Sequence, residues 1–143
     1  MKNQQCILVI EDEKMFKNLL RDMLELEGFQ VICAENGIEG LRCFDEHPVD
    51  LVITDILMPE CEGIETIQIM KEKKPDIKII AISGGGFLKA DYYLYLAGKT
   101  GAICTLEKPF NRKTLIDKVH QMLTNNDDTT LPAVQDLPEE IQF

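Results

Sequence analysis

The sequence lacks the features that mark secreted and membrane proteins. No apolar run approaches the roughly 20 residues that a membrane-spanning helix needs, so we expect no membrane insertion. The polar N-terminus, Met1 to Gln5, leads directly into a strand-like segment and gives no sign of a signal peptide. We therefore expect a cytoplasmic protein.

The sequence also has fewer positively than negatively charged residues. Lys and Arg number 15 against 25 Asp and Glu, which gives a formal net charge of -10. Surfaces that bind nucleic acid need clustered Lys and Arg, so we expect no direct contact with nucleic acid. The acidic balance favours a protein that meets cations or the basic faces of protein partners.

The cysteines include no C-x-x-C pair and are odd in number: Cys6, Cys33, Cys43, Cys61 and Cys104. Three of them lie in apolar strand-like runs, where a thiol usually behaves as a small buried hydrophobe. Their spacing is not that of a usual zinc site. A reduced setting without disulfides is the simplest interpretation.

What the sequence does contain is a series of short apolar runs rich in Ile and Val. The runs are Cys6–Ile10, Val31–Ala34, Val49–Thr54, Ile77–Ile82 and Ile103–Leu106. They are mostly continuous rather than alternating, which is typical of strands covered on both faces.

Stretches with helical period separate these runs. The first has an apolar stripe followed by Gly28 at the expected C-cap: Phe16, Leu19, Leu20, Met23, Leu24 and Leu26. The last follows a candidate N-cap, Asn111, and has its own stripe: Leu115, Ile116, Val119, Met122 and Leu123.

Repeated strand-helix units predict an α/β fold with a parallel sheet and right-handed crossovers. Sequence alone does not give the strand order, but five strands fit the flavodoxin-like doubly wound order 2-1-3-4-5 best, with helices on both faces. We expect one domain over residues 4–123. Residues 124–143 are polar and acidic with two prolines, and predict a disordered tail. A docking segment around Leu131–Leu137 is the alternative.

Polar residues follow the strands at their carboxyl ends, where open parallel sheets bind ligands. Glu11 and Asp12 follow the first strand, Asp55 the third, Ser83 the fourth and Lys108 the fifth. In the order 2-1-3-4-5 the first and third strands are neighbours, so the three acids should converge.

Three neighbouring carboxylates repel each other unless a cation joins them. Magnesium is the natural partner, because it takes carboxylate oxygens and readily adds a phosphate oxygen. A carboxylate in that setting can also be a nucleophile, as in aspartyl-phosphate chemistry. Lys108 and Ser83 could contact the other oxygens of an incoming phosphoryl group.

Four segments in this order, ILVIEDE, DLVITDILMPECEG, IIAISG and LEKPF, resemble the receiver domain of two-component response regulators. The resemblance covers about residues 4–123. It implies that Asp55 is the phosphoacceptor, and that Glu11 and Asp12 are the acidic pair that binds Mg2+, with Asp12 the more direct ligand. The backbone carbonyl of Leu57 would complete the metal site.

The same resemblance gives roles to two more residues. Ser83 matches the hydroxyl residue that hydrogen-bonds the phosphoryl group, and Lys108 matches the lysine that pairs with a phosphoryl oxygen. It also implies a cis Lys108-Pro109 bond. Thr105 departs from the family, which usually has an aromatic residue there. The stretch after Ser83 is longer than usual and carries an uncommon aromatic cluster: Tyr92, Tyr93 and Tyr95.

By this resemblance the protein is a stand-alone receiver and a phosphoprotein of signal transduction. A sensor histidine kinase or a phosphotransfer protein of a phosphorelay would donate the phosphoryl group, and an unknown output protein would read it. We expect no enzyme activity beyond self-phosphorylation and slow autodephosphorylation.

Three alternatives remain. Thr105 and the altered fourth segment also fit a receiver-like interaction module that works without phosphorylation. A flavodoxin-like electron carrier would need a flavin phosphate loop where the sequence has Glu11-Asp12-Glu13. A small hydrolase would use Asp55 as its nucleophile. The three glycines after Ser83 are not followed by G-K-[ST], so they do not form a nucleotide loop.

Overall fold

The five expected strands form one parallel sheet in a computed structural model that describes residues 4–55, 62–84 and 103–124. The strands are β1 (Cys6–Ile10), β2 (Gln30–Ala34), β3 (Leu51–Asp55), β4 (Lys78–Gly84) and β5 (Ile103–Lys108). Their order is β2-β1-β3-β4-β5, with every neighbouring pair parallel. The doubly wound order 2-1-3-4-5 is therefore confirmed.

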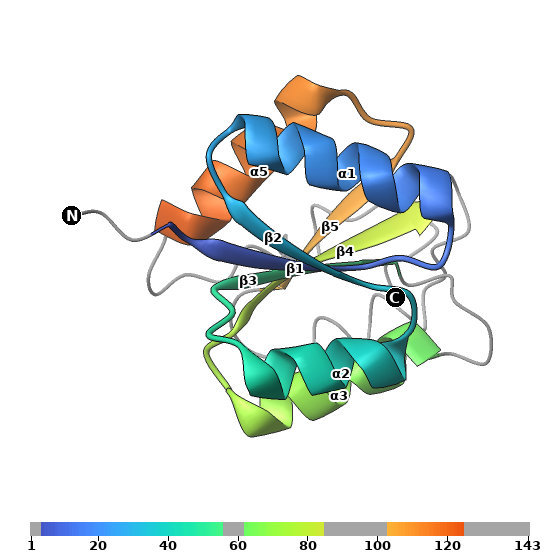
Figure 1. The fold of residues 1–143 in the computed structure, drawn as a ribbon, viewed down its shortest axis with the longest axis vertical. Coiled ribbons are helices and arrows are strands. Elements are labelled where there is room, and N and C mark those ends of the chain that lie inside the picture. Colours follow the sequence, from blue (N-terminus) through green and yellow to red (C-terminus); the bar gives the residue numbers. More distant parts are fainter. Residues whose placement is uncertain (1–3, 56–61, 85–102, 125–143) are drawn as a thin grey trace, which may run out of the picture.

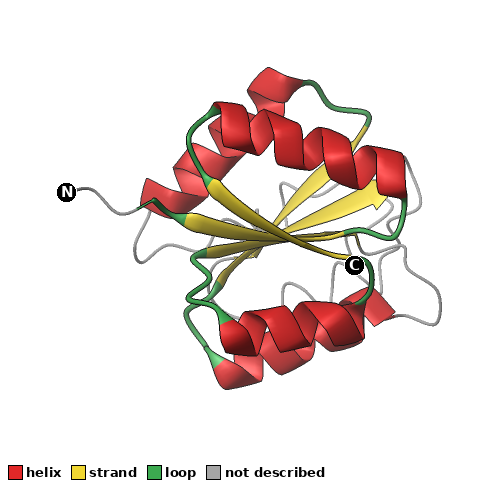
Figure 2. Ribbon diagram, viewed as in Figure 1, coloured by secondary structure: helices red, strands yellow, loops and turns green. Residues whose placement is uncertain are grey.

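Helices cover both faces of this sheet, as predicted (Figure 1). They are α1 (Lys14–Leu26), α2 (Gly37–Glu46), α3 (Glu62–Lys73) and α5 (Arg112–Thr124). Figure 2 shows α1 and α5 on one face of the strands and α2 and α3 on the other. No helix in the described ranges is long and apolar enough to cross a membrane.

The apolar core has two halves, one on each face of the sheet. In β1, Ile7 and Val9 pack on the side of α1 and α5, while Leu8 and Ile10 pack on the side of α2 and α3. Successive side chains of a strand point to opposite faces, so a strand covered twice must be apolar at every position. This explains why the predicted strands read as continuous apolar runs.

The apolar face of α1 is narrower than the sequence predicted. Leu20 and Leu24 are buried, but Leu19 and Leu26 are 52% and 77% exposed, so their assignment to the buried stripe was wrong. A helix turns about 100° per residue. Leu19 and Leu26 therefore stand roughly a third of a turn or more away from the line through Leu20 and Leu24.

The predicted helix ends are confirmed. Gly28 has a positive φ of 97°, and its amide and that of Phe29 donate to the carbonyls of Glu25 and Leu24. This is the Schellman arrangement, which glycine favours. At α5 the side chain of Asn111 accepts a hydrogen bond of 2.8 Å from a first-turn amide, as an N-cap does.

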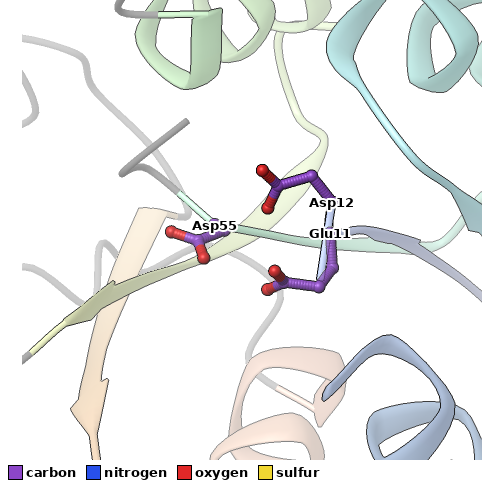
Figure 3. A group of neighbouring side chains, drawn as sticks. All are labelled: Glu11, Asp12 and Asp55. Atoms are coloured by element: carbon purple, nitrogen blue, oxygen red, sulfur yellow. The ribbon is translucent and has the colours of Figure 1, made fainter. Parts of the chain in front are cut away.

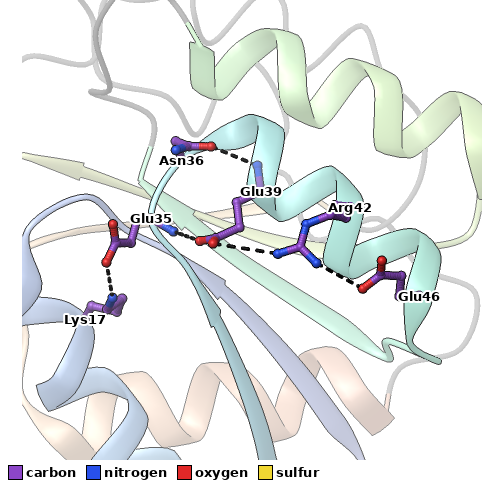
Figure 4. A network of polar contacts seen from close by, with 6 residues as sticks. All are labelled: Lys17, Glu35, Asn36, Glu39, Arg42 and Glu46. Carbon is purple, nitrogen blue, oxygen red and sulfur yellow. Dashed lines mark hydrogen bonds and ion pairs between the residues drawn. The ribbon is translucent and has the colours of Figure 1, made fainter.

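A polar network fixes the start of α2 beside the carboxyl edge of the sheet (Figure 4). Asn36 accepts from the Glu39 amide at 2.8 Å, while the Glu39 carboxylate accepts from the Glu35 amide at 2.7 Å. These reciprocal bonds resemble a capping box. Lys17 of α1 pairs with Glu35 at 3.3 Å, so the network also links the two helices that flank β2.

Several predictions fall outside the described residues. The tail is one of them, since α5 ends at Thr124 and residues 125–143 are not described. The tyrosine cluster and Cys61 also lie outside. The four described cysteines are free thiols: Cys6, Cys33, Cys43 and Cys104.

Candidate functional site

Three carboxylates gather at the carboxyl edge of the sheet because β1 and β3 are neighbours. Glu11 and Asp12 directly follow β1, and Asp55 is the last residue of β3. One oxygen from each side chain lies within 4.8 Å of the other two. Figure 3 shows Glu11 and Asp12 leaving the end of β1 beside Asp55. The convergence predicted from the strand order is confirmed.

The three acids differ in their exposure. Glu11 and Asp55 are 1% and 6% exposed, whereas Asp12 is open to solvent. One oxygen of Glu11 accepts a hydrogen bond from the Glu13 amide at 3.0 Å. The other, Oε1, is buried and has no hydrogen-bond partner within the described parts of the chain. A buried oxygen without a partner is costly, so it suits a ligand that the protein alone does not provide.

The electrostatics of Glu11 reflect this position. Its pKa is raised from 4.5 to about 8, chiefly because burial removes the carboxylate from water. The Glu13 amide opposes that rise, the charge of Asp55 adds to it, and Lys108 lowers it again. When Glu11 is protonated it can donate that proton in a hydrogen bond to the Asp55 side chain, which raises its pKa further.

Lys108, the last residue of β5, brings a cation to the same edge. Its ammonium Nζ lies 3.3 Å from Asp55 Oδ2 and 4.0 Å from Glu11 Oε1. Three carboxylates thus face one ammonium, which leaves an excess of negative charge for a divalent cation to balance. The oxygen donors fit a hard cation such as Mg2+, as does the Glu11 oxygen that receives no hydrogen bond from the described residues.

The Lys108 ammonium also lies over an aromatic ring, which sequence reasoning missed. Nζ is 4.2 Å from the centroid of Phe16 in the first turn of α1. The helical pattern had indicated Phe16 only as part of a core stripe. The sequence indicated only that Phe16 lies early in the helix that follows Glu11 and Asp12, hence near the same edge of the sheet, and it gave no sign of the pairing with Lys108.

The other predicted site residues are described in part or not at all. The cis Lys108-Pro109 bond is confirmed. Ser83 lies in β4, one residue beyond the partner of Asp55 in the strand register, but its side chain is not described. The side chain of Thr105 is not described either, and Leu57 lies outside the described residues.

Comparison with known proteins assigns the chain to a family. The family model of the response regulator receiver domain matches residues 7–120. Chemotaxis protein CheY of Halobacterium salinarum is 34% identical over 119 residues, covering 82% of this chain and 96% of that protein. The chain belongs to the response regulator receiver domain family.

Longer proteins also match. The chain is 32% identical to the transcriptional regulatory protein CpxR of Escherichia coli over 82% of its own length, but it spans only 48% of CpxR. For a putative NtrX-like response regulator of Rickettsia typhi the identity is 36% over 80% of this chain and 24% of that protein. The chain therefore spans half or less of these two relatives.

Solved structures agree with the family assignment. A receiver domain protein of Clostridium thermocellum matches with a TM-score of 0.74 and 34% identity, covering 83% of this chain and 94% of that one. The response regulator TrrA of Thermotoga maritima, solved in complex with Mg2+ and BeF, matches with a TM-score of 0.73 and 35% identity. That match covers 84% of this chain and all of TrrA.

Proposed function

We propose that the protein is a phosphoacceptor switch in which Asp55 takes a phosphoryl group from a phosphohistidine. The observation that carries this proposal is the position of Asp55. Its carboxylate is largely buried at the end of β3, 3.3 Å from the Lys108 ammonium and close to two further acids. An acid held there beside a cation suits a nucleophile better than a turn former.

The donor would be a sensor histidine kinase or a phosphotransfer protein. An oxygen of Asp55 forms a bond to phosphorus while the bond from phosphorus to the histidine nitrogen breaks. The electron pair of that bond stays with the imidazole, which takes a proton from solvent. The product is an acyl phosphate on Asp55 and a neutral histidine on the donor.

Glu11, Asp12 and Asp55 would hold Mg2+, with the backbone carbonyl of Leu57 as the further ligand that the family implies. When bound, the ion supplies positive charge against the phosphoryl oxygens during transfer. The related protein TrrA was solved with Mg2+ and BeF, which supports the choice of metal.

Lys108 would exchange its partner during the reaction. Its ammonium faces the Asp55 carboxylate before transfer, and afterwards it pairs with a phosphoryl oxygen. Ser83 would donate its hydroxyl to a second phosphoryl oxygen. Water later hydrolyses the acyl phosphate, so the chemistry is self-phosphorylation and slow autodephosphorylation rather than turnover of a substrate. An output protein would read the added charge.

Chemical trapping tests this proposal. The protein is incubated with Mg2+ and phosphoramidate, a small donor with a phosphorus-nitrogen bond, and the acyl phosphate is then reduced with borohydride. We expect peptide mass spectrometry to find the reduced side chain at position 55 alone. Modification of other residues instead would contradict the assignment of Asp55. No modification, with Mg2+ binding intact, would favour the interaction module that works without phosphorylation.

A further inference from the structure

We propose that Phe16 is a positioning residue that holds the Lys108 ammonium at the acidic site through a cation–π contact. The inference rests on the proposed function for its consequence, since Lys108 acts there on the phosphoryl group. Its physical basis is independent of phosphorylation. The Lys108 Nζ atom lies 4.2 Å from the centroid of the Phe16 ring.

The contact has the geometry and the setting in which such attraction is strong. Cations within about 6 Å of a ring centroid are attracted to the ring face, and more strongly when water is partly removed. The Lys108 side chain is 29% exposed and has carboxylates at 3.3 and 4.0 Å. The ammonium is therefore partly desolvated, with the ring as an additional anchor beside the two acids.

The Phe16 ring is itself fixed in place. Phe110, in the connection between β5 and α5, meets it edge to face, with centroids 5.9 Å apart and an interplanar angle of 68°. Such pairs are a favoured aromatic geometry. Phe16 also packs against the core on the α1 and α5 face. The ring thus joins α1 to the segment that follows Lys108, and its orientation does not depend on Lys108 alone.

The consequence appears when Asp55 changes its charge and shape. Phosphorylation takes away the carboxylate partner at 3.3 Å, but leaves the ring. The ring attracts the charge of the ammonium without accepting a conventional hydrogen bond. The N–H donors of Lys108 therefore stay available for phosphoryl oxygens. Without the ring, the flexible four-carbon stem of Lys108 would sample more positions. Phe16 therefore keeps the cation within reach during transfer.

Ordinary core packing at Phe16 depends on ring size, whereas a cation–π contact depends on electron density on the ring face. A series of 4-fluoro-, 3,5-difluoro- and pentafluorophenylalanine at position 16 separates the two, because fluorine withdraws that density with little change in size. We expect the phosphorylation rate with Mg2+ and acetyl phosphate to fall along the series by about three- to tenfold in total. Phe16→Trp should keep the wild-type rate. Phe16→Leu should lower the rate by a factor similar to that of the whole fluorinated series.

Phe29 provides the matched control. It is a buried ring in the same half of the core, and its ring partner is His120. The same fluorinated series at position 29 should leave the phosphorylation rate unchanged. A flat series at position 16, or equal slopes at the two positions, would overturn the inference while leaving Asp55 as the acceptor.

An NMR measurement on the unphosphorylated protein tests the contact by itself. The ring current of Phe16 should shift the Lys108 side-chain protons next to Nζ upfield, and Phe16→Leu should abolish that shift. If the wild-type protein takes up no phosphoryl group, the proposed function fails and this measurement alone decides the inference. A Lys108 shift that is the same in Phe16→Leu would overturn it.

Discussion

The buried Glu11 carboxyl group is unfavourable for folding but is suited to binding a cation. It is 1% exposed, and one of its oxygens lacks a hydrogen-bond partner within the described residues. Burial raises its pKa from 4.5 to about 8. Because the folded-state pKa lies above the unfolded value, the stability associated with neutral Glu11 is fully present below about pH 4.5 and is lost as the pH rises through 8.

Replacing this acid should therefore stabilise the protein when no metal is present. At pH 8 with a chelator, we expect Glu11→Gln to raise the free energy of unfolding by about 1–3 kcal/mol, because it removes a carboxyl group whose ionisation is disfavoured by burial. The gain should be much smaller at pH 5, where folded Glu11 is protonated. Urea denaturation at the two pH values measures it. Glu13→Gln, an exposed neighbour, should show no such pH-dependent gain, and an equal response of both variants would contradict the account.

Lys108 is the residue that should convert phosphorylation into a structural change. Lys108→Ala should still accept a phosphoryl group, because Asp55 and the neighbouring acids remain. The variant lacks the ammonium group that would pair with a phosphoryl oxygen. We expect amide chemical-shift changes on phosphorylation to be smaller and more local than in the wild type. Lys113→Ala, an exposed lysine of α5, is the control. Shift changes in Lys108→Ala as extensive as in the wild type would exclude this role.

The secondary structure was predictable from the sequence because strands covered on both faces leave a simple signal. Every described strand matches a predicted apolar run to within two residues at its start. The helix faces were less predictable. Leu19 and Leu26 have the residue type of a core but are exposed, since the arc of α1 that is buried depends on how the helix sits on the sheet.

The site was predictable in its composition but not in its detail. The carboxyl ends of neighbouring parallel strands meet at one edge, so Glu11, Asp12 and Asp55 had to converge once the strand order was correct. Sequence could not tell that Glu11 is buried while Asp12 is exposed, because that depends on side-chain direction beyond the strand end. The contact of Phe16 with Lys108 depends on the relative position of α1 and β5, which no local pattern encodes.

The packing of α2 on β1 depends on a glycine. A Cβ atom at Gly40 would lie 2.5 Å from Ile10 Cδ1 and 2.9 Å from its Cγ1. Ile10 is fully buried and β-branched, so it has little freedom to turn away. Gly40→Ala should therefore destabilise the protein by about 1–3 kcal/mol despite the better helix propensity of alanine. Urea denaturation measures this.

Ile38→Ala provides the matched control for that experiment. Ile38 lies in the same helix and is 81% exposed, so its replacement creates no cavity and no clash. We expect its unfolding free energy to stay within about 0.5 kcal/mol of the wild type. A Gly40→Ala variant as stable as Ile38→Ala would mean that α2 can move away from β1 at little cost.

In the molecule as a whole, the apolar core and the acidic site occupy different places. The two halves of the core lie above and below the sheet, whereas the acidic site lies at the carboxyl edge (Figures 1 and 3). Ligands that bind only the folded state stabilise it by mass action. Mg2+ held by the proposed site should therefore stabilise the entire domain, although Glu11, Asp12 and Asp55 lie only at the ends of two strands.

We expect Mg2+ to raise the melting temperature of the wild type, by the equivalent of about 2.7 kcal/mol when its concentration is 100 times the dissociation constant. The rise should be larger at pH 8 than at pH 6, because Glu11, with a pKa of about 8, must lose its proton for the site to be fully anionic. Thermal melts measure both effects. An equal rise in Asp12→Asn would show that the ion binds elsewhere.

The central claim is that Asp55 is a metal-dependent phosphoacceptor, and intact-protein mass spectrometry tests it most directly. The protein is incubated with Mg2+ and acetyl phosphate, alongside Asp55→Asn and a sample with chelator. The account predicts a gain of one phosphoryl group in the wild type and none in either control. A wild type that gains nothing while binding Mg2+, or an Asp55→Asn variant that gains as much as the wild type, would contradict it.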